Sequence, residues 1–136
     1  MACLDTTMLL DLQGRAGRRA QAHAERAIRG LAAAGEAFVT TRFNVAEVWV
    51  GIERSRDRDR ELRKLKNSLA WIPVLEFDEA AAMRYGVITA ALQRIGRPAG
   101  DMDVLIASVA LVAGETLLTR NARHFADVPG LVVISY

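Results

Sequence analysis

The sequence predicts one α/β domain with a short central parallel sheet of about five strands and helices on both faces. Three observations carry this prediction. Short apolar runs alternate with helical segments along the whole chain, which is typical of parallel strands joined by helices. The runs are continuously apolar, as expected for strands that are covered on both faces. The length of 136 residues matches one domain.

The first part of the chain contains two predicted strands and two predicted helices. The apolar run Ala2–Leu4 predicts a strand, and Thr6–Leu12 predicts a short helix. The stretch Arg18–Ala34 is rich in alanine and arginine, and its apolar residues recur at helical spacing. Gly35 is a natural end for this helix. Ala37–Val39 then predicts the second strand.

The middle of the chain is rich in predicted helix. Thr40 or Thr41 is suited to cap a helix over Arg42–Glu53. A charged helix follows over Arg58–Trp71 and ends before a proline. Val74–Phe77 predicts the third strand.

The last part repeats the alternation of helices and strands. Asp78 is expected to cap the next helix. The predicted elements are a helix over Glu79–Ile95, a helix from Asp101 or Asp103 to Ala113, a strand over Thr116–Thr119, a turn or short helix over Asn121–Phe125 and a strand over Leu131–Ile134.

The net charge of +2 hides an uneven distribution of charge. Residues 15–29 and residues 54–66 each carry a net charge of +4, so the rest of the chain is acidic. Sixteen of the eighteen cationic side chains are arginine, whose planar fork suits phosphate groups. Either stretch alone is explained by a solvated helix face. Together they indicate a polyanionic partner.

Several classes of protein conflict with the sequence. No apolar run approaches the roughly 18 residues of a membrane span, and the first residues lack the features of a signal peptide. We therefore expect a soluble, cytoplasmic protein without a membrane partner. A phosphoacceptor receiver domain needs a lysine after a late strand, but the only lysines are Lys64 and Lys66. No glycine-rich phosphate loop precedes any predicted helix.

Two acids lie where burial would make a charge unfavourable. Asp5 directly follows the first predicted strand, where it either caps the next helix or places a carboxylate at the carboxyl edge of the sheet. The helical neighbours of Glu47 are apolar, among them Phe43, Val48 and Val50. A buried carboxylate is unfavourable unless it is paired or bound to a metal ion. An exposed position for Glu47 is the alternative.

Further polar residues stand at the same predicted edge. Asp101 and Asp103 precede an apolar helix, and we assign the cap to Asp101, because Asp103 shares a face with core residues. Asn121 follows the fourth strand, either as a turn residue or as part of a site. Acids gathered at one edge repel one another without a counter-ion. Since His23 and His124 lack a metal-binding spacing, oxygen ligands favour a hard cation, Mg²⁺ or Mn²⁺.

Four short motifs follow one another along the chain. They are Leu4-Asp5-Thr6-Thr7, Asn44-Val45-Ala46-Glu47, Asp103-Val104-Leu105-Ile106-Ala107-Ser108 and Leu118-Thr119-Arg120-Asn121. In this order they resemble the motifs of PIN-domain nucleases. The length, the helix-rich middle and the ending Val128-Pro129-Gly130-Leu131 are similar to VapC-type toxins of toxin–antitoxin pairs. The resemblance covers essentially the whole chain and implies a single PIN-like domain over residues 1–136.

The resemblance implies a pocket of acids that binds Mg²⁺ or Mn²⁺ and hydrolyses RNA. Matched motif by motif, the catalytic, metal-binding acids are Asp5, Glu47 and Asp103, and Thr7 supports the first of them. The family's fourth acid has no counterpart, because the corresponding segment begins with Asn121 and includes His124 where relatives often have an aspartate.

Other residues complete the predicted site. In place of the fourth acid, Asn121 would position water or the scissile phosphate, and Asp101 is a spare metal ligand. Arginines would grip the RNA backbone without sequence choice. The candidates for RNA binding are Arg15, Arg18, Arg54, Arg58 and Arg120.

The resemblance also implies a homodimer and inhibition by a small VapB-like antitoxin. We interpret the chain as a metal-dependent endoribonuclease that uses a metal-activated water on phosphodiester bonds. The alternative is a non-catalytic module that binds RNA or an antitoxin, which the missing fourth acid favours. Metal-dependent cleavage of RNA would exclude this alternative.

Overall fold

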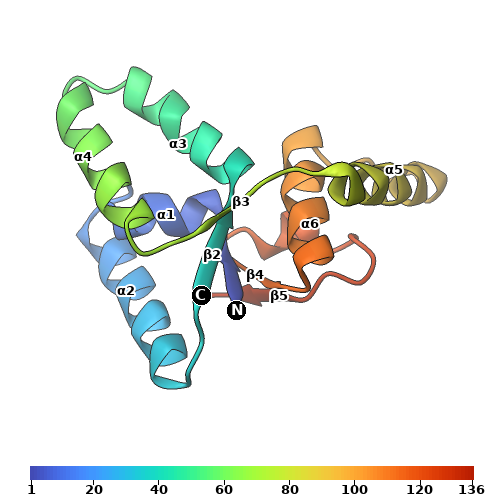
Figure 1. Ribbon diagram of the computed structural model, residues 1–136, viewed down its shortest axis with the longest axis horizontal. Coiled ribbons are helices and arrows are strands. Elements are labelled where there is room, and N and C mark those ends of the chain that lie inside the picture. Colours follow the sequence, from blue (N-terminus) through green and yellow to red (C-terminus); the bar gives the residue numbers. More distant parts are fainter.

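Helices cover both faces of a five-stranded parallel sheet. The computed structural model describes residues 1–136 (Figure 1). In chain order the elements are β1 (Ala2–Leu4), α1 (Thr6–Leu12), α2 (Arg18–Ala33), β2 (Phe38–Thr41), α3 (Arg42–Glu53), α4 (Arg58–Leu69), β3 (Val74–Leu75), α5 (Glu79–Arg94), α6 (Asp101–Ala113), β4 (Thr116–Thr119), the 3₁₀ helix η1 (Ala122–Phe125) and β5 (Val133–Ser135). The strand order is β3-β2-β1-β4-β5, and every pair is parallel. The predicted α/β architecture is confirmed.

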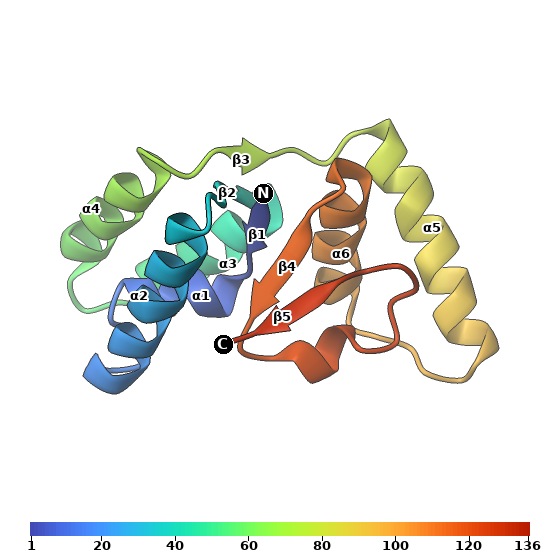
Figure 2. The same ribbon diagram turned by 90° about the horizontal axis from the view of Figure 1, so that it is seen from below.

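Different helices cover the two faces of the sheet. Helices α1 to α4 lie on one side, and α5 and α6 lie on the other (Figures 1 and 2). Successive strand residues point to opposite faces. Leu4 and Leu118 belong to the core beneath α1 to α4, whereas Cys3 and Leu117 belong to the core beneath α5 and α6. Because both faces are buried, the strands are continuously apolar, as the sequence predicts.

The strand order reverses at β1, which is the central strand. The chain runs from β1 to β2 and β3 on one side and then crosses to β4 and β5 on the other. Leu4 pairs with Thr40 of β2 and with Leu118 of β4. In such sheets, ligands bind beyond the carboxyl ends of the strands at the point where the order reverses. Asp5 lies at this point, since its amide donates to the carbonyl of Leu118 at 3.1 Å.

Most of the predicted helix caps are confirmed. Thr41 and Asn44 cap the start of α3 reciprocally, and Asp78 accepts a hydrogen bond from the amide of Ala81 at 2.9 Å. The assignment of Asp101 as the cap of α6 is wrong. Gly100 occupies the cap position, no side chain caps this helix, and Asp101 is its first residue.

The largest boundary difference concerns the last strand. The sequence predicts Leu131–Ile134, but β5 is Val133–Ser135, because pairing of Val133 with Leu117 of β4 sets its register. β3 has only two residues because only Thr40 and Thr41 of β2 pair with it. None of the helices combines the length and apolar character that a membrane crossing needs.

Candidate active site

The carboxylate of Asp5 is buried at the carboxyl end of β1, where it is 5% exposed. Asn44 Nδ2 donates to Oδ1 at 3.1 Å, and the hydroxyls of Thr119 and Thr7 donate to Oδ2 at 2.7 and 3.3 Å. Asp5 precedes α1, but its side chain makes no capping bond to that helix. All three donors are neutral groups, so they orient the carboxylate without compensating its charge.

Glu47 on α3 is half-buried and is connected to Asp5 through shared partners. The Thr6 hydroxyl donates to Glu47 Oε2, and Asn44 Nδ2 donates to Thr6 Oγ1 at 3.0 Å as well as to Asp5. Burial raises the pKa of Glu47 above its usual value, the Thr6 bond opposes this, and the charges of Asp5 and Asp103 raise it further. The alternative of a fully exposed Glu47 is therefore wrong.

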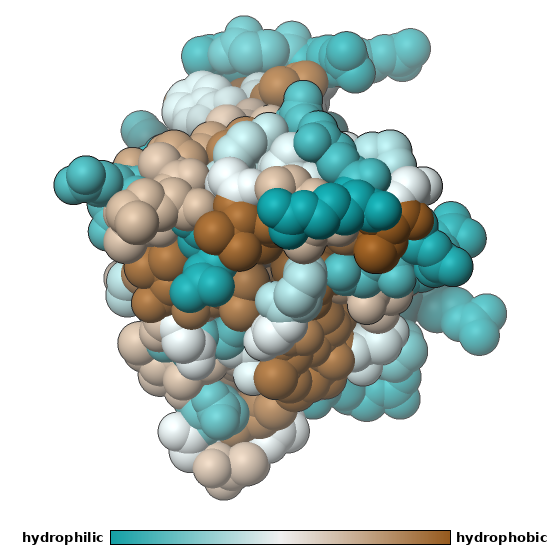
Figure 3. Space-filling model, turned by 90° about the vertical axis from the view of Figure 1, so that its right-hand side faces the viewer, coloured by the Kyte–Doolittle hydropathy of each residue, from teal (hydrophilic) through white to brown (hydrophobic).

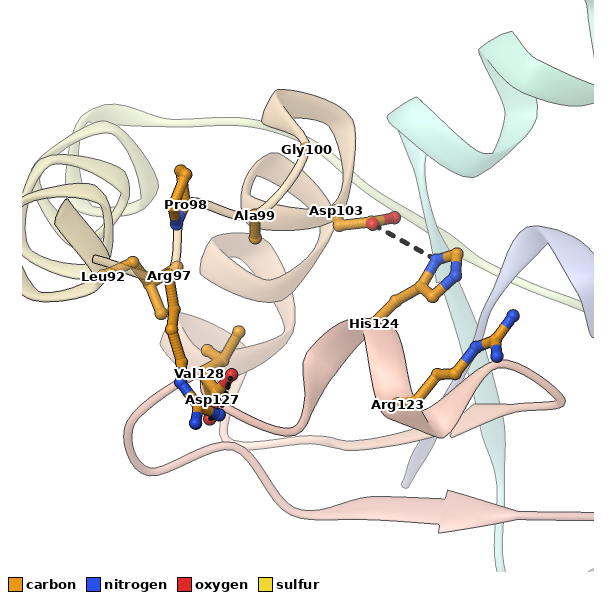
Figure 4. Close-up of a pocket in the computed structure, with 10 residues that line it drawn as sticks. All are labelled: Leu92, Arg97, Pro98, Ala99, Gly100, Asp103, Arg123, His124, Asp127 and Val128. Carbon is orange, nitrogen blue, oxygen red and sulfur yellow. Dashed lines mark hydrogen bonds and ion pairs between the residues drawn. The ribbon is translucent and has the colours of Figure 1, made fainter. Parts of the chain in front are cut away.

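Asp103 lies in the first turn of α6 and faces His124 of η1. His124 Nδ1 is 3.5 Å from Asp103 Oδ2 (Figure 4). Burial raises the pKa of Asp103, the contact with His124 opposes this, and the charge of Asp5 adds to the rise. The sequence placed His124 close to the predicted site, and this contact shows that it borders one of the acids.

The chemistry of the three acids fits a hard divalent cation. Asp5 and Asp103 each raise the pKa of Glu47, so their charges repel one another at this edge of the sheet. No three His, Cys, Asp or Glu side chains lie close enough to form a ready-made metal cluster. The acids therefore act on one another by charge without forming a closed set of ligands. Carboxylate oxygens are the ligands that Mg²⁺ and Mn²⁺ prefer.

A cavity of about 350 Å³ opens next to Asp103. It lies between the loop that joins α5 to α6 and the η1 segment, and its polar lining includes Asp103, Arg123 and His124 (Figure 4). Arg97 and Asp127 line its far end, where Arg97 Nη1 is 3.4 Å from Asp127. The cavity gives a ligand of moderate size access to the Asp103 side of the acids.

The remaining predicted site residues differ in their surroundings. Thr7 contacts Asp5, as the resemblance implies. Asn121 is half-buried, and its backbone N–H donates to Thr119 Oγ1 at 3.0 Å. The carboxylate of Asp101 is exposed and accepts a hydrogen bond from Tyr85 of α5 at 3.3 Å. Asp101 thus contacts a neighbouring helix, Thr7 contacts Asp5 directly, and Asn121 contacts Thr119, which is a partner of Asp5.

The five predicted RNA-binding arginines fall into two groups. Arg15, Arg58 and Arg120 form ion pairs with Glu61, Glu53 and Asp11, respectively. Arg18 and Arg54 are exposed and take part in none of the protein's ion pairs. The second group is the more available to a polyanion.

Sequence reasoning missed several partners of the acids. Asn44 is one helical turn before Glu47, so it lies on the same helical face and reaches both Asp5 and Thr6. Thr119 ends β4 beside Asp5 and donates its shortest hydrogen bond. Asn44 lies at the start of a predicted helix that carries Glu47, and Thr119 ends a predicted strand. These positions could have indicated that both side chains lie close to the acids.

Comparison with known proteins identifies the family of the chain. The model of the PIN domain family matches residues 2–131. The chain therefore belongs to the PIN-domain family. Within the family, its resemblance to VapC-type toxins is confirmed by the relatives that it matches.

Three relatives show the extent of the similarity. The tRNA(fMet)-specific endonuclease VapC of Shigella flexneri is 40% identical over 85 residues, which cover 62% of this chain and 64% of that protein. The chain thus spans just under two thirds of this relative's length. Ribonuclease VapC2 of Haemophilus influenzae is 31% identical over 72% of this chain and 74% of its own. The DNA-bound VapBC structure from Salmonella typhimurium superposes with a TM-score of 0.84 at 26% identity, covering 99% of this chain and 98% of the other.

Proposed function

We propose that this chain is a metal-dependent endoribonuclease and the toxin of a VapC-type toxin–antitoxin pair. The observation that carries the proposal is the position of Asp5, which is buried among neutral donors only where the strand order reverses. Glu47 is connected to it through Thr6 and Asn44, and the charge of Asp103 acts on Glu47. The names of the two relatives, an endonuclease specific for tRNA(fMet) and a ribonuclease, support RNA as the substrate.

The three acids would hold Mg²⁺ or Mn²⁺. A divalent cation would relieve the repulsion that raises the pKa values of Glu47 and Asp103. When bound, the ion ionises a water molecule and stabilises charge at the reacting phosphate. Asp101 is the spare ligand, although its present hydrogen bond is with Tyr85.

The polar neighbours would keep the acids in position for this chemistry. Asn44, Thr7 and Thr119 orient the carboxylate of Asp5 by hydrogen bonds to both of its oxygens. Thr6 fixes one oxygen of Glu47 and leaves the other without a hydrogen bond. The backbone N–H of Asn121 donates to Thr119, and Asn121 would position water or the scissile phosphate.

Arginines outside the group of acids would bind the RNA backbone. Arg18 and Arg54 offer exposed guanidinium groups without an ion pair, whereas Arg15 and Arg58 must first leave an acidic partner. Contacts of this kind supply affinity that depends on salt and carries no direct sequence information. Base preference would have to come from other parts of the site.

The proposal includes a VapB-like antitoxin, a homodimer and action in the cytoplasm, where RNA is available. The solved relative from Salmonella typhimurium is a VapBC complex. Apolar side chains interrupt the hydrophilic surface on the side that carries α5 (Figure 3). Met83 and Val87 of α5 are 70% and 60% exposed, and their i,i+4 spacing places them together on one face that a second copy would cover.

The experiment measures cleavage of RNA by the purified chain with Mg²⁺ or Mn²⁺ and with EDTA. Cleavage is expected with either ion and is expected to stop in EDTA. Glu47→Gln is expected to remove cleavage while melting at or above the wild-type temperature, because the carboxylate is partly desolvated near like charges. Glu79→Gln, which changes an exposed acid at the start of α5, is the matched control.

Three outcomes would contradict the proposal or part of it. Undiminished cleavage in EDTA would remove the metal ion from the mechanism. RNA binding without cleavage under any metal condition would favour the non-catalytic module instead. If Glu47→Gln unfolds the protein, Glu47 has a structural role and its place in the site is wrong.

A further inference from the structure

A second buried acid, Asp11, lies at the other end of α1 from Asp5 and belongs to none of the predicted motifs. It is near the end of α1 and is 1% exposed. Arg120 Nη1 lies 3.1 Å from its Oδ1 and 3.0 Å from its Oδ2. The Tyr136 hydroxyl donates to Oδ2 at 2.9 Å. A side chain buried to this degree with two specific donors fixes the position of those donors.

The same arrangement connects Arg120 to the candidate active site. Arg120 is the residue after Thr119, whose hydroxyl donates to Asp5. The backbone amide of Arg120 donates to Thr7 Oγ1 at 3.1 Å, and Thr7 also contacts Asp5. The backbone of Arg120 is thus held by the partners of Asp5, and its guanidinium is held by Asp11.

A cavity of about 270 Å³ lies against this guanidinium. Residues of α1 and α2 contribute to its lining, whereas the cavity beside Asp103 is lined by residues of α5, α6, η1 and the loops next to them. Its polar lining consists of Asp11, Arg19, His23, Arg120 and Tyr136. Asp11 is the only acid in this lining and is already paired with Arg120. The remaining cationic group, Arg19, takes part in no ion pair of the protein.

We propose that this cavity is a second subsite, which binds a phosphate of the RNA chain that flanks the cleaved one. Arg120 and Arg19 contact the phosphate, and Asp11 and Tyr136 are positioning residues that hold Arg120. The proposal rests on the function proposed above, because it takes RNA as the ligand. Arg120 is one of the predicted RNA-binding arginines, and the proposal adds the cavity in which it acts, a second arginine, Arg19, and the residues that hold Arg120 in place.

The chemistry of the cavity favours a phosphate. Arg120 uses only Nη1 on Asp11, which leaves Nη2 and Nε as donors, and its side chain is 46% exposed. Arginine presents these donors in a planar fork that matches a phosphate. Burial raises the pKa of Tyr136 well above its usual range; the hydrogen bond with Thr7 opposes this rise, and the contact with Asp11 adds to it. The phenol therefore stays protonated at neutral pH and keeps donating to Asp11.

Asp11 also limits the movement of Arg120. A free arginine side chain loses rotamer freedom when it binds a phosphate, and a side chain that is already fixed loses less. Removing the Asp11 carboxylate is expected to weaken the grip on one phosphate without removing the positive charge. This separates a positioning role from a general electrostatic one.

The test uses short RNAs in which one phosphate at a time is an uncharged methylphosphonate. Affinity is measured in EDTA, where cleavage is stopped, and KM and kcat are measured with Mg²⁺. In the wild-type protein, one flanking position is expected to weaken binding by about tenfold when it is made neutral, the size of one charge-assisted contact. In Arg120→Ala the same neutral position is expected to have no effect.

Two further variants test the positioning residues. Asp11→Asn and Tyr136→Phe are expected to reduce the penalty at this one position and to raise KM more than they lower kcat. In the Arg120→Ala background, neither change is expected to add to the loss of affinity. Arg84→Ala on α5 is the matched control, because it removes an exposed arginine on the opposite side of the sheet.

Several results would overturn the subsite. One is an equal penalty at every flanking phosphate in the wild type and in Arg120→Ala. Another is a loss of affinity from Asp11→Asn or Tyr136→Phe that is as large in the Arg120→Ala background as in the wild type. Tyr136→Phe keeps the test decisive if Asp11→Asn fails to fold. If the binding profile appears but no cleavage occurs with metal, the subsite stands and the proposed nuclease activity fails.

Discussion

Asp5 and Asp11 stand at the two ends of α1, and both are buried, yet their neighbours are opposite in kind. Asp5 accepts hydrogen bonds only from an amide and two hydroxyls. Asp11 faces the guanidinium of Arg120 and the phenol of Tyr136. A buried carboxylate needs a compensating charge. The protein supplies that charge to Asp11, whereas in the proposed function a divalent cation would supply it to Asp5.

This difference separates two uses of the same side chain within one helix. At Asp11 the charge is satisfied inside the fold, so its effect on chemistry is indirect and passes through Arg120. At Asp5 the orientation of the carboxylate is fixed by neutral donors and its negative charge has no cationic partner, which favours binding of a metal ion. Buried acids in this protein are therefore distinguished by their partners more than by their depth.

The largest expected effect comes from replacing the two acids in turn. Asp5→Asn is expected to lower the rate of RNA cleavage by about 100-fold or more, because even the partners of metal ligands change activity by roughly 10- to 100-fold. Its free energy of unfolding is expected to stay within about 1 kcal/mol of the wild type, since the lost charge had no ionic partner. Cleavage assays and urea unfolding measure the two quantities.

Asp11→Asn is expected to give the converse result. It is expected to lower the free energy of unfolding by about 2 kcal/mol, less than the roughly 3–5 kcal/mol for a fully buried pair, because Arg120 is partly exposed. Its effect on cleavage is expected mainly in KM. A larger stability loss in Asp5→Asn than in Asp11→Asn would mean that Asp5 is the structural acid and would break the comparison.

The contrast between paired and unpaired groups extends to the arginines of residues 54–66. Arg54, Arg56 and Arg60 take part in no ion pair, whereas Arg58 is bound to Glu53. Replacing the first three with Gln is expected to reduce the slope of log affinity for RNA against log salt by about 2, at roughly 0.7 per phosphate contact for single strands. Arg58→Gln alone is expected to change the slope by less than one such contact. An unchanged slope in the triple variant would leave these arginines as a solvated face only.

The sequence predicted the acids of the site more readily than their partners. Asp5 directly follows an apolar strand, and Glu47 interrupts an apolar helix, so each stands out against its immediate neighbours. The carboxyl ends of parallel strands meet at one edge of the sheet, so a position after a strand is enough to place Asp5 and Asn121 at the same edge. These predictions needed only local pattern and one rule of topology.

The role of Asp11 could not be predicted in the same way. Its partners, Arg120 and Tyr136, are 109 and 125 residues away in the sequence. An acid within a short amphipathic helix is ordinarily solvated, so nothing local marks it as buried. The predicted bounds of β5 were wrong for a related reason. Leu131 to Ile134 are all apolar, and only pairing with β4 selects the residues that form the strand.

The smallest expected effect is on the pH dependence of stability, and it sharpens the comparison between unpaired and paired acids. In the folded protein without metal, burial and the neighbouring acids raise the pKa values of Glu47 and Asp103. A raised pKa means that the folded state holds the proton more tightly than the unfolded state. The stability from these protons is fully present below the ordinary carboxyl pKa of about 4 and is lost as pH rises through the raised values.

Glu61 on α4 has a pKa shift of the opposite sign to those of Glu47 and Asp103. Burial alone would raise the pKa of Glu61, but its bonds from Lys64 and Arg15 together lower it. Its stability contribution is therefore present above the ordinary carboxyl range and is lost as pH falls through the lowered pKa. Urea unfolding in EDTA between about pH 3 and pH 8 is expected to show that Glu47→Gln removes a decline toward high pH, whereas Glu61→Gln removes a decline toward low pH. Saturating Mg²⁺ is expected to reverse the first effect only, because the ion binds the ionised acids and raises stability where they are deprotonated. The same sign for both variants in EDTA would show that Glu47 has a cationic partner in solution, and that the charge at this edge of the sheet is already compensated.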